Sequence, residues 1–221
     1  MFYSTNFWLR DDLKAFAPLF KDFAISTQEF DRNTIIRCPG YKNDNLYYLI
    51  EGLVKASMTN INGLEKTVGY HMPGTLFGLE SLVENQDTLV TFTSVTDTRC
   101  YELSNISVKN MILEDKMFAI KIAEYYCKVL RLMCLETANQ CFNSATARVA
   151  NFLYMYHLSS SNIGFNHLYL TQEEVSSIVN VSRVQVARIY RLLREKDIID
   201  TGRGQVTITD PSKLYSFCNF S

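Results

Sequence analysis

The segment from Thr171 to Arg194 constrains the fold of this chain most, because it has the pattern of two short amphipathic helices joined by a tight turn. Thr171 and Glu174 have the spacing of a capping box, which predicts the start of the first helix. Asn180 falls where the turn needs left-handed backbone, which asparagine tolerates better than most residues. Ser182 is a suitable N-cap for the second helix. The segment therefore predicts a helix-turn-helix, whose second helix lies in the major groove of DNA.

The predicted second helix is basic on its outward face and apolar on the other. Val186, Ile189, Leu192 and Leu193 form the apolar stripe at helical spacing. Residues 182–196 carry four arginines and one lysine against a single glutamate, although the whole chain has a net charge of −1. Arginine and glutamine make bidentate contacts with the edges of guanine and adenine, respectively. We therefore expect base contacts from the first turns of this helix and phosphate contacts from the two cap residues; the predicted set is Thr171, Ser182, Arg183, Val184, Gln185 and Arg188.

A predicted β-hairpin follows the second helix directly. The runs 198–201 and 205–209 alternate as strands do, and Gly202-Arg203-Gly204 separates them. A hairpin at this place converts the motif into a winged helix-turn-helix. Arg203 lies at the predicted tip, where its guanidinium can contact a DNA phosphate. The alternative is a hairpin that only covers the core.

The pattern Ser182-Arg183-x-x-Val186-x-Arg188, with its wing, resembles the DNA-binding domain of the CRP/FNR family of transcription regulators. The resemblance extends into the N-terminal half: Tyr47–Lys55 resembles a strand-turn-strand around a family glycine, and Pro73–Gly78 resembles the turn that opens the ligand-binding cassette. It implies an α+β fold with an N-terminal cupin-like β-roll of the cyclic-nucleotide-binding type. The expected divisions are a β-roll sensor domain at 1–107, a dimerisation helix and hinge at 108–142, and a winged DNA-binding domain at 143–221.

Length and composition agree with this organisation. A chain of 221 residues suits two small domains, each with its own core. The pattern predicts one or two short helices in residues 1–30, strands in 31–104 and one long helix in 108–140. No apolar run is long enough to span a bilayer, and no secretory leader is recognisable. Because six cysteines occur without a leader, we expect reduced thiols, a cytoplasmic protein and no membrane contact.

The predicted long helix carries a repeat typical of a coiled-coil seam. Small or apolar residues recur at alternating intervals of three and four: Ile120, Ala123, Cys127, Leu130, Cys134, Thr137 and Cys141. A second stripe, Ile122, Tyr126, Val129 and Met133, is expected to face the β-domain. A helix with two faces to bury predicts a parallel homodimer. Two helix-turn-helix motifs in such a dimer match a palindromic operator with half-sites about one DNA turn apart.

The cassette departs from the cyclic-nucleotide pattern of the family. Family members that bind cyclic nucleotides use a Gly-Glu pair for the ribose and an arginine pair for the phosphate. Here Gly78 is followed by a glutamate displaced by one residue, Glu80, and no arginine occurs from Phe77 to Thr98. A buried phosphate would lack its bidentate, charge-assisted partner. We therefore expect a small effector other than cyclic AMP, and no bound cofactor.

Tyr125 and Lys128 lie three residues apart on one helix face, near the expected pocket. A family member that senses chlorinated phenols is similar in placing a tyrosine and a lysine on this helix. A lysine there can pair with a phenolate or carboxylate, which favours an aromatic or anionic effector. With Gly78 and Glu80, these two residues are the candidate effector-binding set; the alternative is a solvated lysine beside packed tyrosines.

The resemblance also implies a mechanism. An effector biases two dimer arrangements, and the end of the long helix, Asn139–Asn143, is the expected hinge. RNA polymerase is the expected protein partner, although nothing in the loop 159–167 is diagnostic of it. Cyclic-AMP-type relatives have glutamate where this chain has Val184, and valine can contact only a group such as the thymine methyl. The operator is therefore expected to depart from the cyclic-AMP-receptor consensus at that base pair.

Other functions stay open. The seam cysteines could form an intersubunit disulfide, which would make a redox-switched regulator. A cupin-type metal enzyme needs converging histidines, but of the three only His71 lies in the β-domain. His71 could also ligate haem. We expect no N-terminal iron–sulfur cluster, because no cysteine precedes Cys38. An interaction module that has lost DNA binding is a further alternative. No catalytic constellation is present, so we expect no enzyme activity.

Overall fold

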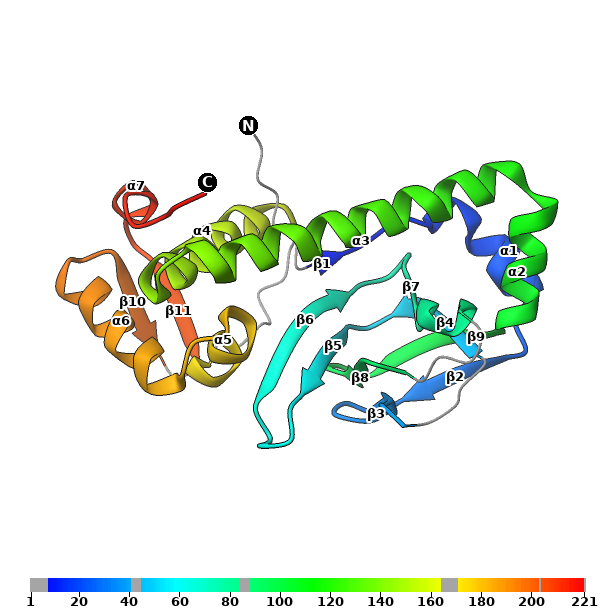
Figure 1. The fold of residues 1–221 in the computed structure, drawn as a ribbon, viewed down its shortest axis with the longest axis horizontal. Coiled ribbons are helices and arrows are strands. Elements are labelled where there is room, and N and C mark those ends of the chain that lie inside the picture. The colour runs from blue at the N-terminus through cyan, green and yellow to red at the C-terminus, as the bar shows by residue number, and fades with distance from the viewer. Residues whose placement is uncertain (1–7, 41–44, 84–87, 164–170, 203, 221) are drawn as a thin grey trace. The chain divides into compact units, whose positions relative to one another are not determined.

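The computed structural model describes residues 8–40, 45–83, 88–163, 171–202 and 204–220. Figure 1 shows its elements, which divide into two compact units. One unit spans Phe7–Arg131, and the other includes Leu132–Ser221. Among the described helices, none is long and apolar enough to cross a membrane.

Two sheets form the β-roll of the first unit (Figure 1). The five-stranded sheet has the order β1 (Trp8–Leu9), β6 (Glu65–His71), β5 (Val54–Thr59), β8 (Thr91–Ser94) and β3 (Ile35–Arg37). The four-stranded sheet has the order β2 (Ser26–Phe30), β9 (Thr98–Ser104), β4 (Asn45–Glu51) and β7 (Leu76–Phe77). The strands pair antiparallel, except that β1 runs parallel to β6. The predicted strand-rich region is therefore confirmed.

Two turns connect strands of the roll, and the first is the glycine turn expected from the family resemblance of Tyr47–Lys55. Gly52, between β4 and β5, has φ of 95°, and a Cβ there would lie 2.4 Å from the carbonyl oxygen of Asp97. Only glycine fits such a position without strain. In the β5–β6 hairpin, Gly63 N donates to Asn60 O at 3.0 Å. The Asn60 side chain also accepts from Leu64 N at 3.0 Å, which closes the turn locally.

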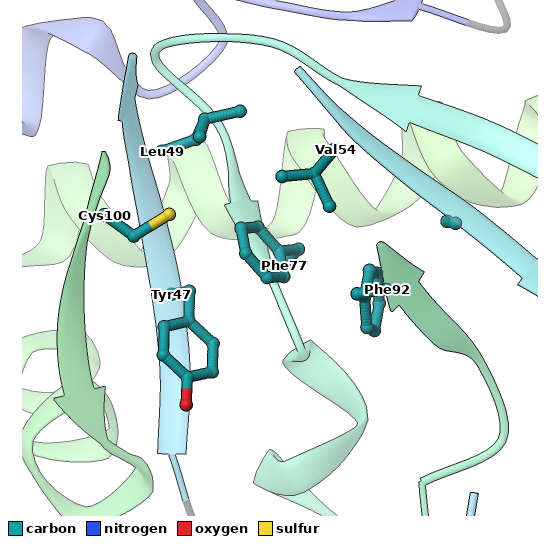
Figure 2. Packing of buried hydrophobic residues seen from close by; sticks show 7 residues of the cluster. Tyr47, Leu49, Val54, Phe77, Phe92 and Cys100 are labelled. Atoms are coloured by element: carbon teal, nitrogen blue, oxygen red, sulfur yellow. The ribbon is translucent and has the colours of Figure 1, made fainter. Parts of the chain in front are cut away.

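The two sheets enclose an aromatic core. Figure 2 shows its labelled members, which come from β4, β5, β7, β8 and β9: Tyr47, Leu49, Val54, Phe77, Phe92 and Cys100. Strand β4 is buried on both faces, because Tyr48, which alternates with these core residues, stacks on Phe20 at a ring-centroid distance of 4.4 Å. Burying one such aromatic side chain contributes roughly 2 kcal/mol. The interior of the roll is therefore tightly packed around aromatic rings.

Helical segments accompany the strands, and two predictions about them are wrong. They are η1 (Lys14–Phe16), α1 (Ala17–Asp22), η2 (Leu79–Leu82), α2 (Asn105–Glu114) and α3 (Lys116–Phe142). The predicted single helix over 108–140 is interrupted at Asp115, whose backbone is extended. The Asp115 carboxylate accepts from Met117 N and Phe118 N, at 2.8 and 3.1 Å, and so caps α3. The predicted helical region at 1–30 is also too long, because residues 26–30 form β2.

A winged helix-turn-helix follows in the second unit. Its elements are α4 (Ala145–Ile163), α5 (Gln172–Val179), α6 (Arg183–Glu195), β10 (Ile199–Gly202), β11 (Gln205–Ile208) and α7 (Pro211–Tyr215). Strands β10 and β11 pair antiparallel and form the predicted wing beside α6 (Figure 1). The core contains fully buried residues from four helices, including Leu153, Ile178, Val186 and Leu214. Ser144 Oγ accepts from Ala147 N at 3.2 Å and so caps the start of α4.

Candidate nucleic-acid interface and candidate effector-binding residues

Local hydrogen bonds hold the two helices of the motif as the sequence predicts. Thr171 Oγ1 accepts from Glu174 N at 3.2 Å, and the Glu174 carboxylate accepts from Thr171 N at 2.8 Å, which completes the capping box. Asn180 ends α5 in the left-handed conformation, with φ of 52° and ψ of 51°. Ser182 Oγ accepts from Gln185 N at 3.3 Å and caps α6. The start, turn and second start of the motif are therefore confirmed.

Two side chains outside the motif hold the turn in place. Arg148, on α4, donates to the carbonyl oxygens of Val179 and Asn180 at 3.3 and 3.1 Å. These carbonyls lie at the end of α5, where helical partners run out and a cation is favourable. Asn180 Nδ2 in turn donates to Gln140 Oε1, on α3, at 3.2 Å. Neither Arg148 nor Gln140 has a motif spacing that identifies it from sequence.

The side chains predicted to contact bases lie on the exposed face of α6. Arg183, Val184, Gln185 and Arg188 are all exposed. The buried face is formed by Val186, Ile189, Tyr190 and Leu193. The prediction that Leu192 is buried is wrong, because Tyr190 faces the core and Leu192 is 37% exposed. Arg203, the predicted phosphate contact of the wing, lies outside the described residues.

In the β-roll, the predicted cassette begins at a glycine packed against an arginine. Gly78 has φ of 80°, and a Cβ there would lie 2.5 Å from Arg37 Nη1. Arg37, on β3, is 4% exposed and donates to Thr88 Oγ1 at 2.8 Å, Asn45 O at 2.9 Å and Gly78 O at 3.3 Å. The segment from Phe77 to Thr98 lacks an arginine, so this guanidinium reaches it from 41 residues upstream. These three hydrogen bonds of the Arg37 guanidinium all go to acceptors within the protein.

Glu80, the displaced glutamate, lies in η2 near Tyr126. Its Oε1 is buried and has no hydrogen-bond partner among the described residues. Tyr126 donates its hydroxyl proton to Leu79 O at 3.0 Å. Burial, with a smaller contribution from the Glu80 charge, raises the pKa of Tyr126 to about 12. Glu80 therefore keeps one acceptor oxygen available for a donor.

A buried polar pair, His71 at the end of β6 and Tyr125 on α3, lies beside aromatic rings of the roll. Tyr125 is 2% exposed, and its hydroxyl donates to Leu76 O at 3.0 Å and lies 3.4 Å from His71 Nδ1. The His71 ring centroid lies 5.6 Å from that of Phe77 and 5.8 Å from that of Phe92. Figure 2 shows these two phenylalanines facing each other in the roll. Burial lowers the pKa of His71 to about 4, so its imidazole is neutral at physiological pH.

Lys128, the predicted contact for an anionic effector, has a carboxylate partner in this chain. Its Nζ donates to both carboxylate oxygens of Asp12, at 2.7 and 2.8 Å. The structure thus gives each predicted effector residue a different neighbour: Arg37 for Gly78, Tyr126 for Glu80, His71 for Tyr125 and Asp12 for Lys128. The sequence offers no signal for Arg37, His71 or Asp12 as partners, because they lie far from these residues along the chain.

A surface groove of about 590 Å³ lies elsewhere on the first unit. Its lining includes Lys14, Lys21, Tyr48 and Tyr101, and none of the four predicted effector residues. Over the part of the chain that the structure describes, no group of three or more His, Cys, Asp or Glu side chains could hold a metal ion.

The predicted seam of α3 is exposed along its whole length. All seven seam residues are exposed in the single chain, with Ile120 at 54% and Leu130 at 64%. Cys127, Cys134 and Cys141 are free thiols. The buried residues of α3 are Phe118, Ile122 and Tyr125. Tyr125 therefore takes the inward position predicted for Tyr126, which is 38% exposed.

A β-roll followed along the chain by a long helix and a winged helix-turn-helix defines a class of effector-responsive DNA-binding proteins. Residues 27–115 match the cyclic nucleotide-binding domain, and residues 147–217 match the Crp-like helix-turn-helix domain. The chain belongs to the CRP/FNR family of transcription regulators. It is thus a DNA-binding regulator with an effector-binding domain, and the resemblance inferred from sequence is confirmed.

Relatives with known names support this assignment. The cyclic AMP receptor protein of Thermus thermophilus is 27% identical over 170 residues, which cover 76% of this chain and 77% of the relative. Among solved structures, the c-di-GMP responsive regulator CLP of Xanthomonas campestris matches with a TM-score of 0.79 and 19% identity, covering 88% of this chain and 98% of that one. CprK complexed with OCPA matches with a TM-score of 0.73 and 19% identity, covering 95% and 97%. At these identities the structures establish the fold.

Proposed function

We propose that this regulator is a homodimer that binds a palindromic operator through α6 and responds to a small aromatic effector other than cyclic AMP. The main support for the proposed homodimer is the α3 seam. Its residues recur at coiled-coil spacing and are all exposed, whereas the residues that α3 buries lie on another face. An exposed apolar stripe of this kind marks an interaction surface, and a second copy presents the identical stripe.

For DNA recognition, the proposal assigns base contacts to Arg183, Gln185 and Arg188, and a thymine methyl contact to Val184. All four side chains are exposed on the first turns of α6. Thr171 and Ser182 stand at the N-termini of α5 and α6, where free backbone N–H groups favour a phosphate. Arg203 remains the predicted wing contact. RNA polymerase as a partner and a cytoplasmic location remain predictions from sequence.

For the effector, the proposal rests on the chemistry of the roll interior. His71 and Tyr125 offer hydrogen-bonding groups next to the rings of Phe77 and Phe92. This combination of aromatic rings and two polar groups suits a flat aromatic compound with one polar substituent, which would bind by displacing part of the packed interior. A cyclic nucleotide phosphate needs a charge-assisted partner, and Arg37 already donates to three protein acceptors. An anionic substituent would gain Lys128 only by displacing Asp12.

Thermal unfolding with candidate effectors tests the effector assignment. A ligand that binds only the folded state raises Tm, and the shift grows with the logarithm of the ratio of free ligand concentration to Kd. We expect phenols and aromatic acids to raise Tm and to increase DNA affinity, and Tyr125→Phe, which keeps the ring and removes the hydroxyl, to reduce both effects. If cyclic AMP raises Tm and DNA affinity and the aromatic compounds do not, the assignment is wrong.

Sedimentation and selection of bound sites from random DNA test the other two parts. A dimer at micromolar concentration and a palindromic selected site are expected. A monomer that selects a single half-site contradicts the proposed assembly. Recovery of the unchanged cyclic-AMP-receptor consensus contradicts the role given to Val184.

The exposed seam cysteines favour a second candidate function, a redox-switched regulator. Cys127, Cys134 and Cys141 recur every seven residues, so a parallel dimer places each beside its symmetry mate. Mild oxidation by a peroxide would then join two thiols in a disulfide and release two protons and two electrons to the oxidant. A covalent dimer on a non-reducing gel, lost in the triple serine variant, is expected. Absence of that band after oxidation removes this candidate.

A further inference from the structure

Four asparagines form a hydrogen-bonded network at the end of α3. They are Asn139 and Asn143 in and after the last turns of α3, Asn151 on α4, and Asn219, which follows α7. Asn143 Nδ2 donates to Asn139 Oδ1 at 2.8 Å, and Asn151 Nδ2 donates to the same oxygen at 3.1 Å. Hydrogen bonds between side-chain amides thus join the C-terminal end of α3 to the beginning of α4.

Asn219 closes this network from the C-terminal segment. Its carbonyl oxygen accepts from Asn143 Nδ2 at 3.0 Å and from Asn151 Nδ2 at 2.9 Å. Its own N–H donates to Asn151 Oδ1 at 2.9 Å, and its Nδ2 donates to Asn143 Oδ1 at 2.8 Å. Asn151 is only 7% exposed. Without Asn219, its Oδ1 would lose the N–H from which it accepts, and its Nδ2 would keep only Asn139 Oδ1 as a partner. An unpaired buried polar atom is costly.

Aromatic packing holds the segment that carries Asn219. The Phe220 ring centroid lies 6.0 Å from those of Tyr154 and Tyr215. Tyr154 and Tyr215 lie 5.1 Å apart and connect α4 to α7. The position of Asn219 is therefore fixed from two sides, by the aromatic cluster and by the amide network.

The same turn of α3 also bonds directly to the DNA-binding motif. Gln140, between Asn139 and Asn143, accepts from Asn180 in the turn of the helix-turn-helix. The last turn of α3 is thus tied to α4, to the C-terminal segment and to the turn before α6. Asn139–Asn143, the hinge expected from sequence, belongs to the compact unit that includes Leu132–Ser221.

We propose that Asn219 is a positioning residue for DNA recognition, which fixes the angle between the end of the seam helix and the helix-turn-helix. In a dimer, that angle determines the distance between the two α6 helices and hence the half-site spacing of the operator. The inference rests on the proposed homodimer. It assigns to the C-terminal segment a role in DNA recognition without any contact with DNA.

The test compares affinities for two operators with full-length protein and its variants. One operator is the palindrome selected by the wild-type protein, and the other has one base pair inserted between its half-sites. Asn219→Asp keeps the volume and the backbone bonds but sets a carboxylate against Asn143 Oδ1. Deletion from Asn219 onward removes all four hydrogen bonds of Asn219 with Asn143 and Asn151. Asn110→Ala, at an exposed asparagine on α2, is the matched control.

We expect the wild-type protein and the control to prefer the native spacing, and both Asn219 variants to lose on the order of tenfold of that preference. The ratio of the two affinities is the decisive quantity, because a loss of folded protein lowers both affinities equally and leaves the ratio unchanged. Variants that keep the wild-type ratio, at whatever absolute affinity, overturn the inference. Sedimentation of the wild-type protein separates the two proposals: a monomer overturns the dimer and this inference together, whereas a dimer with unchanged variants overturns this inference alone.

Discussion

The two units differ in how their functional residues are brought together. In the winged unit, the residues that shape the motif lie close along the chain: Thr171 bonds Glu174, and Ser182 bonds Gln185, three residues apart in each case. In the β-roll, Tyr125 meets His71 across 54 residues and Arg37 meets Gly78 across 41. The DNA-binding motif is therefore shaped by hydrogen bonds between residues close in sequence. The candidate effector site depends on contacts between residues far apart in sequence.

The units also differ in the chemistry they present. The exposed face of α6 offers charged and amide groups to a polyanion, and its affinity is expected to fall steeply with salt. The interior of the roll offers a neutral imidazole and a phenol among aromatic rings. In an apolar binding site, a small number of such polar groups determines which ligand binds. Substitutions in the two units should therefore separate into effects on DNA binding and effects on folding and effector response.

The largest expected effect is on folding of the roll. Gly52→Ala places a Cβ 2.4 Å from a backbone carbonyl oxygen at a left-handed φ, and we expect a loss of about 3 kcal/mol or more in the free energy of unfolding. Gly63→Ala is the matched control, because its φ is 77° but nothing lies within 4 Å of the added Cβ. Urea unfolding followed by circular dichroism measures both. Equal losses in the two variants would show that the close contact at Gly52 is relieved at little cost.

This difference between units sets how much could be predicted from sequence. The helix-turn-helix followed from the capping box at Thr171 and the left-handed turn at Asn180, because each is a local rule with few solutions. The β-roll was expected from the family resemblance of Tyr47–Lys55 and Pro73–Gly78. Two errors concern the ends of helices, because Asp115 interrupts the predicted long helix and residues 26–30 form a strand. The other errors concern helical phase. Tyr190 rather than Leu192 is buried on α6, since three- and four-residue spacings both fit a stripe and only packing selects between them.

The candidate effector site could be predicted only in part. Tyr125 is buried, as expected for an effector contact, although the stripe predicted to face the β-domain contained Tyr126 in its place. Its partner His71, and the carboxylate of Asp12 that binds Lys128, come from other strands and segments. Because no sequence periodicity connects residues on different segments, the sequence indicates Tyr125 and Lys128 as candidates but does not identify the residues that contact them.

The second-largest effect is a pH dependence of stability due to His71. Burial lowers its pKa from 6.5 to about 4. Between these values the unfolded chain binds a proton that the folded chain does not, so stability present above pH 6.5 is lost as the pH falls toward 4. The full loss is about 3 kcal/mol. Urea unfolding of the wild-type protein and of His71→Gln between pH 7 and 4.5 measures it by difference, and parallel curves for the two proteins would contradict it.

The third effect belongs to the winged unit and leaves folding intact. Arg183→Ala and Arg188→Ala each remove an exposed guanidinium from α6, and each should weaken binding to the selected operator by about 1–3 kcal/mol. Lys116→Ala is the control for net charge, because Lys116 is an exposed lysine in the other unit. Fluorescence anisotropy with operator and with unrelated DNA measures affinity and specificity together. Retained operator affinity in both arginine variants would favour an interaction module without DNA recognition.

The smallest effect concerns the ion pair of Lys128 and Asp12. It tests whether Lys128 can bind an anionic effector. The pair is partly exposed, with side-chain exposures of 35% and 19%, so Asp12→Asn should cost only about 0.5 kcal/mol of stability. The substitution releases the ammonium from its carboxylate partner. If an effector contacts Lys128, aromatic acids should bind Asp12→Asn more tightly than the wild-type protein, whereas the corresponding neutral amides should bind both equally. Calorimetric titration of the two ligands against the two proteins distinguishes an effector contact from a structural ion pair: equal affinities throughout would confine the role of Lys128 to binding Asp12.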